Sequence, residues 1–194
     1  MRNDDFNILG KLKLIFTSPS TFFEKNLRGD SISGSIILFL LVSIIAAFTS
    51  FIISAHRSNI LFFPTELIHS SILRNSIRQP FLGLACIFVF AFIALLVARM
   101  LGGVGGYKHN INVMAYSWIP NAIFSGFPGL PAGIGFGLGA VAFIYSIYLG
   151  VIGLAMDHRI SRRKALYSYI APCLIFIVGA ILFYIFVFAI RSLF

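Results

Sequence analysis

The sequence predicts an all-α, polytopic integral membrane protein: a bundle of five transmembrane helices with short interfacial helices. Hydrophobic residues make up 59% of the 194 residues and charged residues only 11%, where soluble domains have roughly 25% charged residues. All six acidic residues lie outside five long apolar stretches between Ser35 and Ile190. Because a charge at the bilayer centre costs about 2.5–3.5 kcal/mol, this exclusion is typical of segments that lie in lipid.

The chain divides into a cytoplasmic amphipathic segment, residues 1–34, and a transmembrane domain, residues 35–194. The five apolar stretches are residues 35–54, 81–98, 111–124, 132–156 and 165–190. Twenty helical residues span about 30 Å, which matches the hydrocarbon thickness. Pro80 is expected in the first turn of the second stretch. The third stretch is short and contains Pro120, so a tilted, kinked helix packed within the bundle is the alternative there.

The distribution of basic residues predicts a cytoplasmic N terminus. Five crossings place eleven lysines and arginines on the N-terminal side of the membrane and four, Arg57, Arg74, Arg78 and Arg191, on the other. Basic residues concentrate in cytoplasmic loops, so the C terminus is expected outside. The net charge of +9 is then explained by topology and by anionic lipid headgroups, and nucleic acid is not expected as a partner.

Three segments outside the spans have the pattern of interfacial helices. Phe6–Phe16 alternates apolar residues with lysines, as a helix lying on a membrane surface does. Ser18 and Pro19 supply an N-cap and a first-turn proline for a second short helix. A third is expected from Pro64 to Ile72. These helices either brace the ends of the bundle or dock a partner.

Three further segments carry a resemblance to a known family. They are Phe16-Thr-Ser-Pro-Ser-Thr-Phe-Phe23, Leu101-Gly-Gly-Val-Gly-Gly-Tyr107 continuing into Met114-Ala-Tyr-Ser-Trp-Ile-Pro120, and Tyr145-Ser-Ile-Tyr-Leu-Gly-Val-Ile-Gly-Leu154 followed by Ile160-Ser-Arg-Arg-Lys-Ala165. In order and spacing the chain resembles the Yip-one domain family of Ypt/Rab-interacting membrane proteins, from about residue 12 to residue 175.

The resemblance implies a five-helix membrane domain with the N terminus in the cytoplasm and the C terminus outside. Eukaryotic members are linked to Rab-type GTPases and vesicle traffic. This chain lacks their Asp-Leu-Tyr-Gly-Pro motif and has a short N-terminal region, so it is similar to the shorter prokaryotic members. A prokaryotic cytoplasmic membrane is the expected location.

The basic loop after the fourth stretch is the first candidate site. Arg159, Arg162, Arg163 and Lys164 place four cations within six residues, and each is worth about 1 kcal/mol near an anionic leaflet. Lipid headgroup contact and topology are the simplest roles, and a protein docking surface is the alternative. The main functional hypothesis is therefore a membrane-organising or partner-recruiting protein that acts through its cytoplasmic face.

Polar residues on the third and fourth stretches are the second candidate site. Buried hydroxyls and amides need hydrogen-bond partners, so these groups either bond between helices or line a polar cavity. A cavity favours the alternative function, a small uncoupled transporter or channel for a solute or lipid between the third and fourth helices. The candidate cavity residues are Asn112, Tyr116, Asn121, Tyr145 and Tyr148.

Glycines form two patterns. Residues 102–108 lack the ending of a P-loop, so a tight turn is expected there and a phosphate cradle is the alternative. Gly129, Gly133 and Gly137 are spaced four apart, which lets helix backbones approach closely in lipid. Packing within one chain is the first interpretation, and a homo-oligomer through the same ridge is the second.

No residues with the pattern of a catalytic or cofactor site stand out. The four histidines are scattered without metal-ligand spacing, and no nearby set of carboxylates accompanies them. Cys86 and Cys173 both lie in apolar stretches, where buried, unpaired thiols are expected. We therefore expect no enzyme activity, no metal and no cofactor.

Overall fold

The computed structural model describes residues 8–27, 31–57, 71–125 and 132–191, and every regular element in these ranges is an α-helix. The all-α prediction is thus confirmed. In chain order the helices are α1 (Ile8–Thr17), α2 (Pro19–Asn26), α3 (Ile32–Arg57), α5 (Ser71–Met100), α6 (Tyr107–Ser117), α7 (Ile119–Ser125), α8 (Ala132–His158) and α9 (Arg162–Arg191).

Four helices in the described part are long and apolar enough to cross a membrane. The qualifying stretches are Ile32–Ile52, Ile77–Met100, Ile134–His158 and Arg162–Phe186. They correspond to the first, second, fourth and fifth predicted spans. The third stretch is divided between α6 and α7, neither of which has the length of a span, so the count of five spans is not confirmed.

The break between α6 and α7 has a local cause. Pro120 has no N–H to donate to the carbonyl of Tyr116, and its ring crowds that carbonyl, so a regular helix cannot continue through it. The chain instead turns at Trp118, whose N–H bonds to the carbonyl of Met114. The kinked, packed form is therefore the one that the structure adopts.

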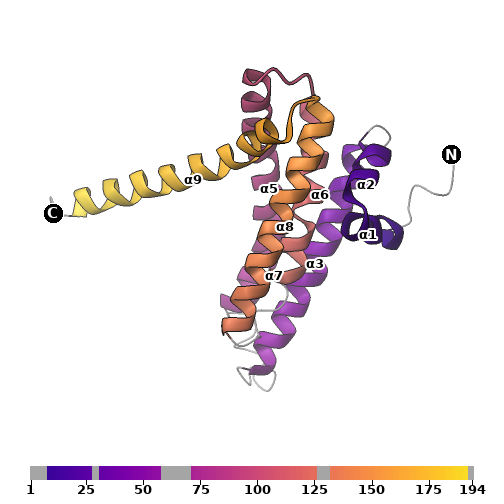
Figure 1. Ribbon diagram of the computed structural model, residues 1–194. Coiled ribbons are helices and arrows are strands. Elements are labelled where there is room, and N and C mark those ends of the chain that lie inside the picture. Colours follow the sequence, from indigo (N-terminus) through magenta and orange to yellow (C-terminus); the bar gives the residue numbers. More distant parts are fainter. Residues whose placement is uncertain (1–7, 28–30, 58–70, 126–131, 192–194) are drawn as a thin grey trace.

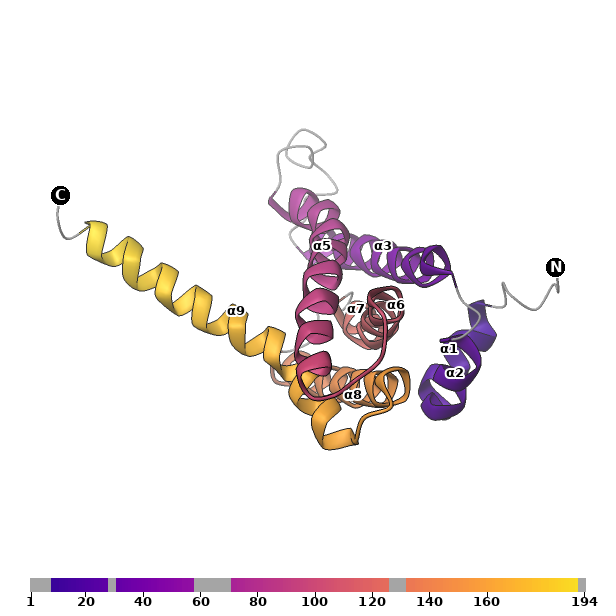
Figure 2. The same ribbon diagram turned by 90° about the horizontal axis from the view of Figure 1, so that it is seen from above.

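Helices α6 and α7 form the centre of the bundle. Seen from above, α3, α5 and α8 stand around them (Figure 2), and each of the three packs against α6. Every residue of α6 from Asn110 to Ser117 is buried. A helix enclosed on all sides must satisfy its polar side chains against neighbouring helices, and this decides much of the chemistry described below.

The hairpin formed by α1 and α2 packs along the side of the bundle (Figures 1 and 2). Ile15, Phe22 and Phe23 are almost fully buried, and the ring of Phe22 meets Tyr116 edge to face at 4.8 Å. Pro19 opens α2 as predicted, whereas the Ser18 side chain makes no capping hydrogen bond. The hairpin therefore belongs to the core through its aromatic residues.

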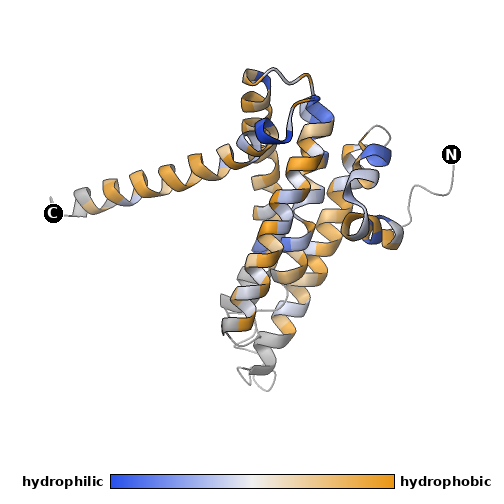
Figure 3. Cartoon of the chain, viewed as in Figure 1, coloured by the Kyte–Doolittle hydropathy of each residue, from blue (hydrophilic) through white to orange (hydrophobic). Residues whose placement is uncertain are grey.

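Helix α9 leaves the bundle after its first half (Figure 1). Its early residues pack on α5 and α8, and Phe176 stacks on Phe90 at 5.1 Å. Beyond that point the helix is mostly hydrophobic (Figure 3) and its apolar side chains, such as Ile181, Leu182 and Phe183, are exposed. Only 11% of its apolar span is buried, against 33–39% in the other three. The outer half of α9 is thus an apolar helix that has no neighbour among the described residues.

Two predicted boundaries need correction or lie outside the described residues. Helix α5 begins at Ser71, so Pro80 lies inside it and not in its first turn. The predicted short helix from Pro64 to Ile72 falls mostly on residues 58–70, outside the described ranges, and Ile72 itself belongs to α5.

Candidate functional site

The end of the bundle formed by residues 99–110 and 157–164, here called the basic end, brings two loops together. Arg159, Arg162, Arg163 and Lys164 are all exposed there, and Figure 3 shows the hydrophilic residues gathered at this end. Arg159 follows α8 with φ of 54°, a left-handed conformation that ends the helix. The Lys164 ammonium donates to the carbonyl of Leu101 at 2.8 Å, so this cation also ties the two loops together.

His158 holds the glycine-rich loop in place. The N–H of Gly105 donates to His158 Nδ1 at 3.1 Å, and the N–H of Val104 donates to the His158 carbonyl at 3.2 Å. A side chain on Gly105 would collide with His158 and Asp157, so only glycine allows this approach. The expected tight turn at residues 102–108 is present, and two of its backbone N–H groups, those of Val104 and Gly105, are hydrogen-bonded to His158.

Asp157 adds a second link between the loops. Its Oδ1 lies 2.9 Å from His109 Nδ1, and its side chain is 5% exposed while that of His109 is 41% exposed. The fourth apolar stretch was predicted to end at Met156, and no pairing of Asp157 with a histidine was predicted. The last turn of α8 extends to His158 and carries the carboxylate into contact with α6.

A cavity of about 640 Å³ adjoins this carboxylate at the basic end. It lies between α2, the glycine-rich loop, the start of α6 and the end of α8. Charged side chains of both signs line it, which suits a polar or zwitterionic group better than an apolar one. Those charged or titratable residues are Glu24, Lys108, His109, Asp157 and Arg159.

The five predicted cavity residues occupy separate environments. Asn112 is fully buried and accepts a hydrogen bond from Ser35 Oγ at 2.6 Å, so it joins α6 to α3. Tyr116 is buried against Phe22. These two polar groups serve contacts between helices, one of the two roles left open by the sequence.

Tyr145, Tyr148 and Asn121 lie elsewhere. The hydroxyl of Tyr145 donates to the Ile15 carbonyl at 2.8 Å and fastens α1 to α8. Tyr148 is exposed beside it, with ring centroids 5.8 Å apart. Asn121 lines a different cavity, between α3, α5 and α7. The structure therefore does not bring the five residues into one cavity between the third and fourth predicted spans.

The glycine ridge is only partly described. Gly129 lies outside the described residues, Gly133 lies in α8, and Gly137 has open space where a side chain would be. Close helix packing instead uses Gly150 against Tyr169 and Gly153 against Val113. A homo-oligomer through the ridge stays a prediction.

The buried polar residues at the basic end were not among the predicted site residues. His158 Nε2 lies 2.7 Å from Asn110 Oδ1, and Asn110 Nδ2 donates to the Ala91 carbonyl at 3.1 Å. The available signal was topological: the predicted spans place residues 101–110 and 157–164 at the same membrane face. Among the described residues, no group of three or more histidine, cysteine and acidic side chains is suited to hold a metal ion.

Comparison with known proteins gives one match. The family model of the Yip1 domain matches residues 13–183, which covers the chain from α1 well into α9. No curated protein and no solved structure matches.

Proposed function

Because the chain belongs to the Yip1 domain family, and because its basic end presents a fixed cationic surface, we propose that it is a non-enzymatic membrane protein that organises anionic lipid or recruits a partner there. The family and the apolar helices make it a multi-pass integral membrane protein. The proposal adds what this end of the molecule does.

The proposed orientation places the basic end and the N terminus in the cytoplasm and the C terminus outside, in a prokaryotic cytoplasmic membrane. Arg159, Arg162, Arg163 and Lys164 are exposed where α8 ends and α9 begins. A cytoplasmic leaflet carries the anionic headgroups that such residues attract. The positive-inside rule supports the same orientation.

One observation carries the proposal: the cationic loop is held by the glycine-rich loop beside it. His158 and Lys164 bond to that loop at 3.1 and 2.8 Å, so the arginines project from a braced surface. Bracing lowers the conformational entropy lost when a headgroup or a protein binds. The adjoining cavity with charges of both signs offers a place for a partner's polar groups.

The decisive variant is Arg162→Gln with Arg163→Gln, both on exposed positions. Two lost cations at about 1 kcal/mol each should lower the ratio of phosphatidylglycerol to phosphatidylethanolamine that copurifies with the protein by up to about 30-fold. The double lysine variant keeps the charge and should keep the ratio. Mild crosslinking in cells tests the partner arm, since the glutamine variant should also lose a reproducible crosslinked partner. If neither lipid ratio nor crosslinks change, the proposal is wrong.

The transport hypothesis has no single cavity to support it, because its five residues lie apart. It stays a prediction for reconstituted vesicles, where flux of a solute or lipid would be measured directly.

A further inference from the structure

A second cavity, of about 510 Å³, lies between α3, α5 and α7, away from the basic end. This volume is in the range of small-molecule sites in proteins, roughly 300–1,000 Å³. Its walls are largely apolar, with Phe39, Leu82 and Trp118 among them, but they also include four polar side chains. These are Ser43, Arg78, Gln79 and Asn121.

The hydroxyl of Ser43 is buried and has no hydrogen-bond partner among the described residues. Ser43 is 8% exposed. Other hydroxyls on helices of this chain bond back to the carbonyl four residues earlier, as Thr49 does to Ile45 and Ser168 to Lys164. Burial of an unpaired hydroxyl is unfavourable, so a group that enters the cavity and bonds to Ser43 would be stabilised.

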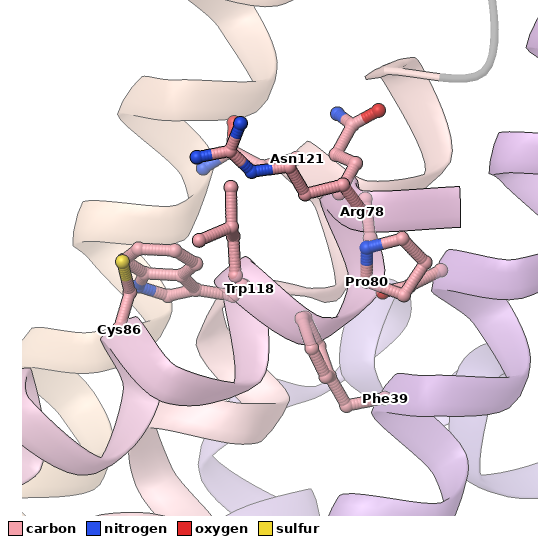
Figure 4. A pocket seen from close by; sticks show the side chains of 11 residues that line it. Phe39, Arg78, Pro80, Cys86, Trp118 and Asn121 are labelled. Carbon is pink, nitrogen blue, oxygen red and sulfur yellow. The ribbon is translucent and has the colours of Figure 1, made fainter. Parts of the chain in front are cut away.

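The polar groups gather at one end of the cavity. A side chain on Gly83 would lie 3.1 Å from the ring of Phe39, which sets these two residues opposite each other. Helices α3 and α5 run antiparallel (Figure 1), so one turn further along α3 Ser43 comes level with Gln79. Figure 4 shows Arg78 and Asn121 at one side of the cavity and Phe39 at the other.

Arg78 is the charged member of this group. It lies one residue inside the apolar span that starts at Ile77, and no ion pair with it occurs among the described residues. A guanidinium forms strong paired hydrogen bonds with carboxylate and phosphate. An arginine at the polar side of a largely apolar cavity therefore matches a ligand that has an anionic head and a hydrocarbon tail.

We propose that this cavity binds a single-chain or double-chain amphiphile whose carboxylate or phosphate pairs with Arg78. Ser43, Gln79 and Asn121 supply hydrogen bonds to the head, and one acyl chain lies along Phe39 and Trp118. A free fatty acid and an anionic phospholipid share this chemistry. The site is independent of the cationic loop and of the function proposed for it.

The test uses the full-length protein in lipid nanodiscs with three photoactivatable probes that carry the same diazirine chain: palmitic acid, phosphatidylglycerol and neutral diacylglycerol. Adducts of an anionic probe should map to residues 79–86 and 118–122, which include cavity-lining residues of α5 and α7. Arg78→Gln should reduce them about tenfold, as expected for a lost charge-assisted bond, and should leave the neutral probe unchanged. Lys13→Gln, which removes one exposed cation of α1 outside both proposed sites, is the matched control.

A milder variant guards against misfolding. Ser43→Ala removes only the hydroxyl, and it should weaken labelling two- to three-fold, an effect of the size expected of one neutral hydrogen bond.

Cys86 also lines the cavity and provides a second measurement. In a Cys173→Ser variant it is the sole thiol of the chain. Added palmitate or phosphatidylglycerol should slow the alkylation of Cys86. Whichever of palmitate and phosphatidylglycerol labels the cavity and protects Cys86 more strongly shows whether the anionic head belongs to a fatty acid or to a phospholipid. The proposed site would be wrong if the anionic probes labelled wild type and Arg78→Gln equally. It would also be wrong if the adducts were spread over lipid-facing residues such as Phe136.

Discussion

The imidazole of His158 and the amide of Asn110 lock the end of α8 to the first turn of α6, with Nε2 2.7 Å from Oδ1. Since Gly105 donates its N–H to Nδ1, the proton of this neutral ring belongs on Nε2, which donates to Asn110. Asn110 then donates to the Ala91 carbonyl of α5. Two side chains thus connect three helices and a loop.

Replacing His158 with alanine should therefore destabilise the whole basic end. The change leaves a buried amide oxygen and a buried backbone N–H without partners, each worth about 1–3 kcal/mol. We expect a loss of about 3 kcal/mol, measured by thermal melting in detergent with far-ultraviolet circular dichroism. His109→Ala, at a side chain that is 41% exposed, should cost clearly less. Equal melting temperatures for wild type and the His158 variant would contradict the role assigned to this ring.

Gly150 should be the least replaceable of the α8 glycines. A side chain there would overlap the ring of Tyr169, which is itself buried, whereas Gly137 and Gly139 have open space. Gly150→Ala should cost several kcal/mol, since overpacking forces the helices apart, and Gly137→Ala should be neutral or stabilising by up to about 1 kcal/mol. The same melting assay compares the two. A destabilising Gly137→Ala would instead indicate a contact that this single chain does not show.

The contrast between these glycines shows what the sequence could predict. Apolar stretches and their charge-free character are local properties, so four long helices were predicted, although α5 begins at Ser71 and not at residue 81. Which face of a helix meets a neighbour depends on its rotation within the bundle. Ser35 and Asn112 pair across 77 residues and His109 and Asp157 across 48, and nothing local in the sequence specifies either pairing. For the same reason spacing alone selected Gly137, while the close approaches occur at Gly150 and Gly153.

Tyr145 offers a test of how the N-terminal hairpin is held. Its hydroxyl donates to the Ile15 carbonyl at 2.8 Å, and its ring stacks on Phe16 at 5.7 Å. Tyr145→Phe removes the hydrogen bond and keeps the ring stacking. The free energy needed to open α1 from the bundle should therefore fall by about 1 kcal/mol. Hydrogen exchange of residues 8–17 should rise roughly five-fold. Tyr148→Phe, at an exposed ring, is the control, and an unchanged exchange rate in the Tyr145 variant would show that the hydroxyl does not hold α1.

We expect that α6 and α7 together complete a crossing of the membrane. With 11 and 7 residues and about 1.5 Å per residue, the two helices reach roughly 27 Å, close to the hydrocarbon thickness of about 30 Å. Helix α6 is buried among α3, α5 and α8, and α7 is partly buried against α3 and α8, so their polar residues do not prevent a crossing. If they cross, the chain traverses the membrane five times and its ends lie on opposite sides.

Single cysteines in a variant with Cys86→Ser and Cys173→Ser decide the matter. Ser161→Cys, exposed in the loop before α9, should react with a membrane-impermeant maleimide only in inverted vesicles, because basic loops stay inside. A cysteine added after Phe194 should react only in intact cells. A cysteine added before Met1 should match the Ser161 position. Labelling of both chain ends from the same side would mean four crossings, and α6 with α7 would then be a re-entrant segment that returns to the face it entered.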